Sequence, residues 1–374
     1  MPDASAISPA RVVVADDNAL MRSIVSRSLE KAGVDVVGSA RNGDEALELC
    51  ERERPDAMTL DLTMPGLDGL GVLRALRGRP GAGIPVVVVS AFSAAHGARA
   101  VDALAEGAFD LVPKPAANEG LEGFIEVLGT KVRLAAASQR MRAFRRTART
   151  LAAQQPTAAA SPPWRAAADA PGRQTAPPRP SPAAGPAPAR LLIIASSTGG
   201  PRALAALVPK LPSPLGIGTL IVQHMPAGFT GSLASRLDCD AELQVREAGG
   251  GERLDPRTAL IAPGGRHMRL CTGGHISVSD TPAVGGLRPR ADLLIEDAAR
   301  VYGPRLLLVV LTGMGNDGLR GAQEVRRQGG RVLVESEQSC TVYGMPRAIV
   351  DHGLADGVLT LDELAGAIAQ EAGR

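Results

Sequence analysis

The chain has 374 residues, of which 45% are hydrophobic and 21% charged, and its formal net charge is +2. This length suits two domains, and the near-neutral charge provides no strong field to attract a nucleic acid or a membrane surface. Aromatic residues make up only 2%, which argues against a stacking platform for single-stranded nucleic acid. Because no apolar run approaches the roughly 18 residues of a spanning helix, and no secretory signal pattern begins the chain, we expect a cytoplasmic protein without membrane insertion.

The first part of the chain alternates short β-branched runs with longer amphipathic segments. The runs are RVVVA, VDVVG, DAMTLD, IPVVVVS and AFDLV, within residues 11–112. Strands that alternate with helices predict a parallel sheet covered on both faces, and five such units fit the flavodoxin-like doubly wound order. We therefore predict a first α/β domain over residues 10–130.

The middle of the chain changes composition twice. A basic stretch, KVRLAAASQRMRAFRRTART, is followed at residues 152–189 by a segment of mostly Ala, Pro, Ser and Thr. The basic stretch predicts a helix with a solvated face. The alternative is that it contacts nucleic acid or an acidic partner. Because the second segment cannot bury a core, we predict a basic helix and a disordered, long Ala/Pro-rich linker over residues 131–189.

A second alternation begins at Leu191. The runs LLIIA, TLIVQ, TALIAP, LLLVVL and RVLVE predict strands, and the segment HMRLCTGGHISVS predicts a β-hairpin that turns at residues 272–274. We therefore predict a second doubly wound parallel-sheet α/β domain, with a β-hairpin excursion, over residues 190–372.

Five polar side chains follow predicted strands of the first domain. Asp16 and Asp17 come after the first strand, Asp61 ends the third, Ser90 ends the fourth, and Lys114 follows the fifth. Because the carboxyl ends of parallel strands meet at one edge, the three carboxylates should converge, and such an oxygen-only set favours Mg²⁺. A hydroxyl and an ammonium there would bind phosphoryl oxygens. The alternative, a rim of solvated acidic loops, explains any one of these residues but not all five.

Chemically complementary residues follow three predicted strands of the second domain. Ser196 and Ser197 end the run LLIIA, His224 ends TLIVQ, and Asp317 follows LLLVVL. A hydroxyl nucleophile needs a base, and an imidazole base needs a carboxylate to orient it, so these residues predict a serine hydrolase triad. The order Ser, His, Asp differs from that of the α/β-hydrolases.

The glycines after Ser197 allow another interpretation. Gly199 and Gly200 lie between a strand and a helix, where backbone N–H groups could bind a phosphate. The sequence contains neither G-x-x-x-x-G-K-[ST] nor G-x-G-x-x-G, so a nucleotide site is the weaker hypothesis.

The motifs VVVADDN, TLDLTMPGLDGL, VVVVSA and PKP resemble the receiver domain of two-component response regulators. Where receivers often carry an aromatic switch residue, this chain has Leu111, which puts aromatic rotation as the switching device in doubt. The resemblance implies these roles: Asp61 accepts the phosphoryl group of a histidine kinase, Asp16 and Asp17 hold Mg²⁺ with it, Lys114 pairs with the phosphate, and Ser90 is the switch hydroxyl.

The motifs STGGP, QHMPAGFTGSLASRL, IAPGGRHM, LTGMGNDGL and TVYGMPRA resemble the catalytic domain of the chemotaxis receptor methylesterase family, CheB. The resemblance implies that Ser197 is the nucleophile, His224 the base and Asp317 the orienting carboxylate. It also implies that the Met314 N–H stabilises the oxyanion and that Thr198 helps to hold His224.

The two resemblances together imply a phosphorylation-activated serine hydrolase. It would demethylate glutamyl methyl esters and deamidate glutamines on methyl-accepting chemoreceptors, for adaptation in chemotaxis or a related chemosensory pathway, without a cofactor for the esterase reaction. One alternative is a receiver joined to a non-catalytic binding domain that uses the same rim. A DNA-binding response regulator is disfavoured because the second half shows no helix-turn-helix pattern.

Overall fold

The computed structural model describes residues 8–77, 83–91, 94–153 and 190–373, apart from 116–120. The predicted Ala/Pro-rich linker, at residues 154–189, lies outside the described residues. Among the helices of the described part, none combines the length and the apolar character needed to cross a membrane.

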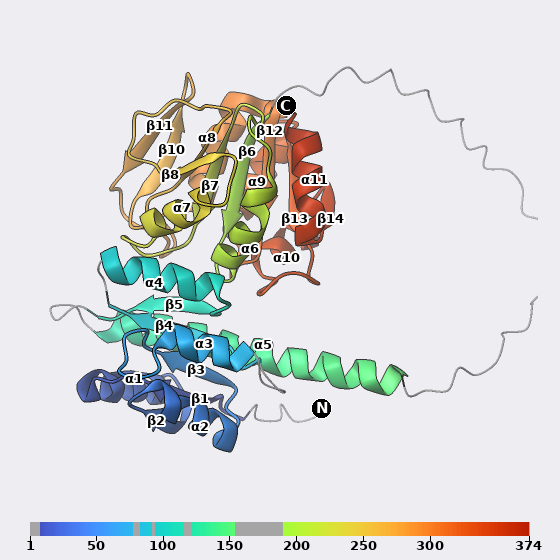
Figure 1. Ribbon diagram of the computed structural model, residues 1–374. Coiled ribbons are helices and arrows are strands. Elements are labelled where there is room, and N and C mark those ends of the chain that lie inside the picture. The colour runs from blue at the N-terminus through green and yellow to red at the C-terminus, as the bar shows by residue number, and fades with distance from the viewer. Residues whose placement is uncertain (1–7, 78–82, 92–93, 116–120, 154–189, 374) are drawn as a thin grey trace, which may run out of the picture.

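The first domain is a parallel sheet with helices on both faces (Figure 1). Its strand order, β2-β1-β3-β4-β5, is the predicted flavodoxin-like order. In chain order its elements are β1 (Arg11–Ala15), α1 (Ala19–Lys31), β2 (Asp35–Ala40), α2 (Gly43–Glu53), β3 (Ala57–Leu60), α3 (Gly69–Arg77), β4 (Val86–Ser90), α4 (Ala94–Ala105), β5 (Asp110–Pro113) and α5 (Leu121–Ala153).

Helix α5 runs without a break across residue 130, where we expect the first domain to end from sequence. Val132 and Ala135 are fully buried in the same core as β1 and β4. One turn further on, the Arg140 guanidinium lies 2.6 Å from the Asp56 carboxylate. The helix therefore belongs to the first domain at least as far as Arg140, because its apolar face keeps the 3.6-residue period beyond the predicted boundary.

The second domain is a larger parallel sheet with a separate hairpin. Its sheet order is β14-β13-β12-β6-β7-β9-β8. In chain order its elements are β6 (Leu191–Ser196), α6 (Gly200–Leu207), η1 (Val208–Lys210), β7 (Gly218–Gln223), α7 (Thr230–Asp238), β8 (Gln244–Glu247), β9 (Thr258–Ile261), β10 (His267–Cys271), β11 (His275–Ser279), α8 (Ala291–Tyr302), η2 (Gly303–Arg305), β12 (Leu306–Val310), α9 (Leu319–Arg327), β13 (Arg331–Glu335), α10 (Met345–Asp351), β14 (Gly357–Leu359) and α11 (Leu361–Ala372).

The predicted hairpin is present as β10 and β11, which pair antiparallel. Two strands, β8 and β14, were not predicted from sequence. Both are edge strands, and three of the four β8 residues are exposed. A strand at the edge of a sheet needs no continuous apolar run, so the pattern that marks the central strands is missing here.

Strand β6 lies in the middle of the second sheet and is buried on both faces. Leu192 and Ile194 pack into one core with α6, α7 and α11, while Leu191 and Ile193 pack into another with α8, α9 and α10. This alternation follows from the two-residue period of a strand. Neighbours β7 and β12 pair with β6 in parallel, so the three strands bring their carboxyl ends to one edge.

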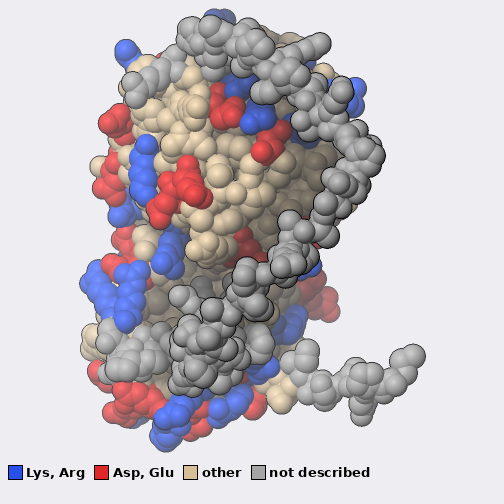
Figure 2. All heavy atoms as spheres, turned by 90° about the vertical axis from the view of Figure 1, so that its right-hand side faces the viewer, with Lys and Arg blue, Asp and Glu red and all other residues tan. Residues whose placement is uncertain are grey.

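That edge of the second sheet faces the first domain (Figure 1). Helix α4 packs against α6 and α7. A Cβ added at Gly97 of α4 would lie 3.0 Å from the Gly228 carbonyl oxygen, so the two domains approach closely at this point. On the face shown in Figure 2, basic and acidic side chains are interspersed over both domains, in keeping with the small net charge.

Candidate active site

The two serines at the end of β6 differ in their surroundings. Ser196 is fully buried, and its hydroxyl donates to the Gln223 side-chain oxygen at 2.7 Å. Ser197 is partly exposed. Its carbonyl oxygen accepts from the Gln223 amide nitrogen at 2.9 Å, and the same nitrogen donates to the His224 carbonyl oxygen at 3.1 Å. The Gln223 side chain thus fixes the backbone of Ser197 relative to that of His224, and leaves Ser197 as the accessible hydroxyl.

Gly200 makes room for this arrangement. A Cβ at Gly200 would lie only 1.9 Å from the Gln223 side-chain oxygen, so any other residue there would displace the glutamine. The sequence predicts the glycines as a possible phosphate cradle, whereas in the structure one of them accommodates a side chain of the neighbouring strand. Gln223 itself is not predicted from sequence, although it lies beside His224 in the motif QHMP.

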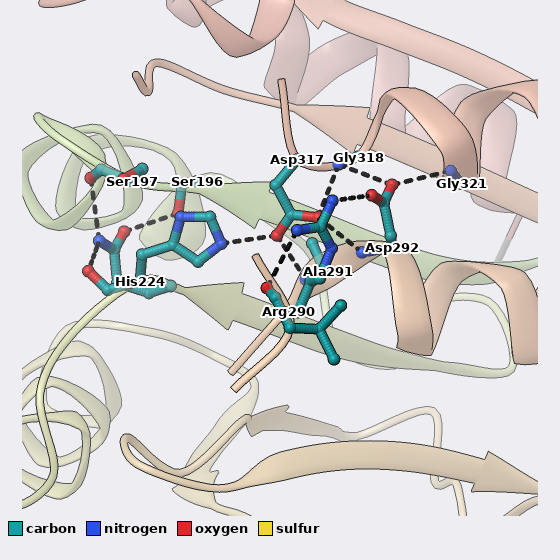
Figure 3. A network of polar contacts seen from close by, with 11 residues as sticks. Ser196, Ser197, His224, Arg290, Ala291, Asp292, Asp317, Gly318 and Gly321 are labelled. Atoms are coloured by element: carbon teal, nitrogen blue, oxygen red, sulfur yellow. Dashed lines mark hydrogen bonds and ion pairs between the residues drawn. The ribbon is translucent and has the colours of Figure 1, made fainter. Parts of the chain in front are cut away.

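The structure brings His224 and Asp317 together. The Nε2 atom of His224 lies 2.8 Å from the Asp317 Oδ2 atom, and both side chains are at least nine-tenths buried (Figure 3). Since Nε2 faces a carboxylate, it carries the proton, and the lone pair of the neutral ring resides on Nδ1. The imidazole therefore presents its basic nitrogen away from Asp317.

The Asp317 carboxylate lies at the N-terminus of α8 and is surrounded by donors. Its Oδ2 atom accepts from the Ala291 N–H at 2.7 Å, and Oδ1 accepts from the Asp292 and Gly318 N–H groups, each at 3.0 Å (Figure 3). Burial opposes ionisation of this carboxyl, but the bond to His224 and the backbone donors outweigh it and lower its pKa to about 2. Asp317 is therefore a fixed negative charge at neutral pH.

Asp292 forms the reciprocal contact from α8 to α9. Its Oδ1 atom accepts from the Gly318 and Gly321 N–H groups, each at 2.9 Å, so each aspartate binds backbone N–H groups at the start of the other's helix (Figure 3). Burial, reinforced by the nearby charge of Asp317, raises the pKa of Asp292. Neither Asp292 nor the nearby Arg290 is predicted from sequence as part of the site. A polar pair at the start of a helix is typical of ordinary helix capping.

The loop after β12 lies against Ser197. The Ser197 N–H donates to the Thr312 carbonyl oxygen at 3.0 Å, and a Cβ at Gly313 would lie 2.9 Å from that of Ser197. Met314 follows with 43% of its surface exposed. Within the described part of the chain, the Met314 N–H donates to no other group, so it is free to bind an oxygen beside Ser197.

Thr198 does not make the contact that we expect from sequence. Its hydroxyl donates to the Asp110 carboxylate of β5, in the first domain, at 2.6 Å, and not to His224. Lys131 of α5 holds the other Asp110 oxygen at 2.7 Å. The prediction is corrected for a physical reason: the carboxyl end of β6 abuts the other domain, which offers the threonine a charged acceptor.

The predicted carboxylate cluster of the first domain is assembled in the structure. Ligand oxygens of Asp16, Asp17 and Asp61 all lie within 4.8 Å of one another, and Lys114 Nζ lies 2.8 Å from both Asp16 and Asp61. Burial raises the pKa of Asp16, assisted by the charge of Asp61, whereas the two carboxylates raise that of Lys114 against the effect of burial. The buried Ser90 hydroxyl has no hydrogen-bond partner in the described part of the chain.

This donor set fits Mg²⁺ and a phosphoryl group. The Lys114 ammonium contacts only two of the three carboxylates, so negative charge remains for a divalent cation, which prefers oxygen ligands. The unpaired Ser90 hydroxyl offers a donor to an additional oxygen atom. Both features suit the binding of Mg²⁺ together with a phosphoryl group.

Comparison with known proteins matches both halves of the chain. The CheB methylesterase family model matches residues 192–368, and the response regulator receiver domain model matches residues 12–126. A protein-glutamate methylesterase/protein-glutamine glutaminase of Symbiobacterium thermophilum is 40% identical over 368 residues, 98% of each chain. One of the same name from Moorella thermoacetica is 41% identical, covering 96% of this chain and 97% of its own.

Among solved structures, the Thermotoga maritima CheB methylesterase catalytic domain is 39% identical and covers 48% of this chain and 97% of its own, with a TM-score of 0.47. The response regulator domain of Thermotoga maritima CheB is 32% identical and covers 34% of this chain and 97% of its own, with a TM-score of 0.31.

Proposed function

Because the chain belongs to the CheB methylesterase family, we propose that its second domain hydrolyses glutamyl methyl esters of chemoreceptors with Ser197 as the nucleophile. The contact between His224 and Asp317, at the sheet edge where β6 leads into Ser197, supports this most directly. The relatives named above carry protein-glutamate methylesterase and protein-glutamine glutaminase in their names. Both activities are acyl transfers to water, which one serine site can catalyse.

The proposed reaction begins with attack of the Ser197 Oγ on the ester carbonyl carbon. His224 takes the serine proton at Nδ1, while Asp317 holds the opposite ring nitrogen and stabilises the imidazolium. The Met314 N–H donates to the oxyanion, a contribution of about 3 kcal/mol in comparable sites. His224 then passes the proton to the departing methanol, and water, activated by the same nitrogen, hydrolyses the acyl-enzyme to glutamate.

The same steps convert a glutamine side chain to glutamate. The carbonyl carbon of the carboxamide is attacked in the same way, and His224 protonates the departing nitrogen, so that ammonia leaves in place of methanol. The carboxamide is the harder substrate because its leaving group is poorer. No cofactor takes part in either reaction.

The first domain is proposed to regulate this site through phosphorylation of Asp61 by a histidine kinase. Asp16, Asp17 and Asp61 would hold Mg²⁺, which when bound neutralises the charge of the incoming phosphoryl group. Lys114 pairs with the phosphoryl oxygens, and the unpaired Ser90 hydroxyl binds another. The Thr198 contact with Asp110 supports a resting state in which the receiver covers the sheet edge that carries Ser197. Phosphorylation would shift the equilibrium toward a state in which the receiver has moved away from that edge.

This chemistry requires two partners, both in the cytoplasm. The kinase supplies the phosphoryl group, and the methylated receptor segment is the substrate. The test is methanol release from a methylated receptor fragment, with and without a small phosphodonor and Mg²⁺. We expect release by the wild type that the phosphodonor increases, and none above background by Ser197→Ala. Binding of the fragment by Ser197→Ala, together with no turnover by the wild type, would instead favour a non-catalytic receptor-binding domain.

A further inference from the structure

Arg290, the residue before α8, lies between two buried carboxylates behind His224. Its Nη2 atom is 2.7 Å from the Asp292 Oδ2 atom, and its Nε atom is 3.4 Å from the Asp317 Oδ1 atom (Figure 3). The Arg290 side chain is 13% exposed and each carboxylate is 1% exposed. A third contact, from Nη1 to the Val284 carbonyl oxygen at 3.1 Å, fixes the plane of the guanidinium.

The two carboxylates need a cation. Two negative charges buried side by side repel each other, and a nearby imidazole would respond by taking up a proton more readily. The guanidinium is the cation that this pair has in the described part of the chain. Burial opposes the charge on Arg290, but the bond to Asp292 and the charge of Asp317 outweigh it and raise the pKa of the guanidinium.

We propose that Arg290 is a positioning residue that fixes Asp317 and balances the charge of Asp292, so that His224 faces one net negative charge and not two. The inference rests on the proposed function, since it concerns the group that we assign as the base. A general base is most effective when it is neutral yet still basic at the working pH. Without Arg290, a larger fraction of His224 would be protonated near neutral pH and unable to accept the serine proton.

Other charged groups lie near His224 and its two carboxylates, and their charges would stay the same when Arg290 is substituted. Glu296 lies on α8, one turn beyond Asp292. From the first domain, the Asp110 carboxylate reaches Thr198 already paired with Lys131. Glu335 of β13 is buried behind the loop after β12, where it accepts from the Thr312 N–H. A change in His224 titration on substitution of Arg290 therefore reports the guanidinium itself.

The test measures His224 directly and does not depend on turnover. The full chain has five histidines, so the His224 ring resonance is assigned by comparison with His224→Gln and followed by NMR as a function of pH. We expect Arg290→Gln to raise the midpoint of His224 titration by about one pH unit. Arg290→Lys keeps the charge and should remain near the wild type. The double variant Arg290→Gln/Asp292→Asn removes one charge of each sign and should also titrate near the wild type.

Arg288 supplies the matched control. It lies in the same loop, is exposed, and donates to the carbonyl oxygens of Asp280 and Thr281, each at 3.3 Å. Arg288→Gln removes the same charge away from the carboxylates, so the His224 midpoint should stay at its wild-type value. An equal shift in Arg288→Gln and Arg290→Gln, or no shift in either, would overturn the proposal.

Activity adds a second readout. In Arg290→Gln, the acidic limb of the kcat/KM profile should move to higher pH by the same amount as the His224 midpoint. If Arg290→Gln does not fold, the double variant decides, because a His224 midpoint displaced from the wild-type value despite balanced charge contradicts the proposal. A wild type without esterase activity would refute the proposed function, whereas the NMR midpoints would still test the role of Arg290.

Discussion

The molecule contains two clusters of buried carboxylates that are built on opposite principles. At the receiver site, three aspartates lie together and a single lysine contacts two of them. Behind His224, by contrast, the Asp317 oxygens accept from three backbone N–H groups and one imidazole, with Arg290 alongside. Correspondingly the pKa of Asp16 is raised and that of Asp317 is lowered to about 2.

The difference separates two uses of a carboxylate. A cluster with too few donors is ready to take up a cation and a phosphoryl group, because these supply the missing positive charge and hydrogen bonds. A carboxylate with every lone pair engaged is a poor nucleophile and a poor metal ligand, but it holds an imidazole in one orientation. The predictions below test whether each cluster behaves in its own way.

The largest effect should come from removing the charge of the fully engaged carboxylate. Asp317→Asn should lower kcat by about 10⁴-fold, since an amide can hold His224 in the wrong tautomer. Methanol release measures this. Asp297→Asn is the matched control, because Asp297 is a partly buried acid of α8 that is likewise paired with an arginine, Arg269, at 2.6 Å. A loss of less than tenfold in Asp317→Asn would mean that His224 does not depend on the carboxylate.

Removing the proposed phosphoryl acceptor should affect only the response to a phosphodonor. Asp61→Asn should retain basal methanol release and lose a stimulation of about tenfold or more, the usual range for coupling between sites. Phosphorylation is followed in parallel by mass spectrometry. Incorporation of phosphate into Asp61→Asn at the wild-type level would show that another residue is the acceptor.

Acid titration should reveal the engaged carboxylate as a source of stability. Because the pKa of Asp317 in the folded protein, about 2, lies below its ordinary value of 3.8, its contribution is complete above about pH 4 and is lost as the pH falls toward 2. The contribution at neutral pH is about 2 kcal/mol. Urea unfolding of the wild type and Asp317→Asn should therefore differ at pH 7 and converge in acid. A difference that stays constant with pH would refute this.

The smallest effect concerns the contact between the two domains. Asp110→Ala should raise basal activity about tenfold, since a hydrogen bond to a charged group contributes about 1.5 kcal/mol net to the closed arrangement. Lys131→Met is the control, because it removes the partner of Asp110 within the receiver but leaves the Thr198 contact. The measurement is the basal rate of methanol release by each unphosphorylated variant. Equal rates in Asp110→Ala and the wild type would show that this contact does not restrain the active site.

The central strands and the edges at which the polar residues gather are predictable from sequence, because strands buried on both faces give continuous apolar runs. The runs that became β6, β7 and β12 placed His224 and Asp317 at one edge, where the structure brings them together. Edge strands β8 and β14 carry no such run. The composition changes at residue 130, where we predict the first domain to end, although the apolar face of α5 continues beyond it.

Contacts between distant segments are harder to predict. Thr198 and Asp110 are 88 residues apart and belong to different domains, so no local pattern relates them. Arg290 and Asp292 look like surface charges at a helix start until α8 and α9 are packed together. The sequence therefore predicts which residue types meet at the edge of a sheet, but not the charges that approach from behind.

The reciprocal contacts of Asp292 and Asp317 have a consequence for how the molecule opens locally. Each aspartate holds amides at the start of α8 or α9, so neither helix can fray at that end without releasing the other. The amides of Ala291, Asp292, Gly318 and Gly321 should therefore exchange with solvent as one cooperative unit, at a single opening free energy. His224, the proposed base, would then be oriented only in molecules in which that unit is closed.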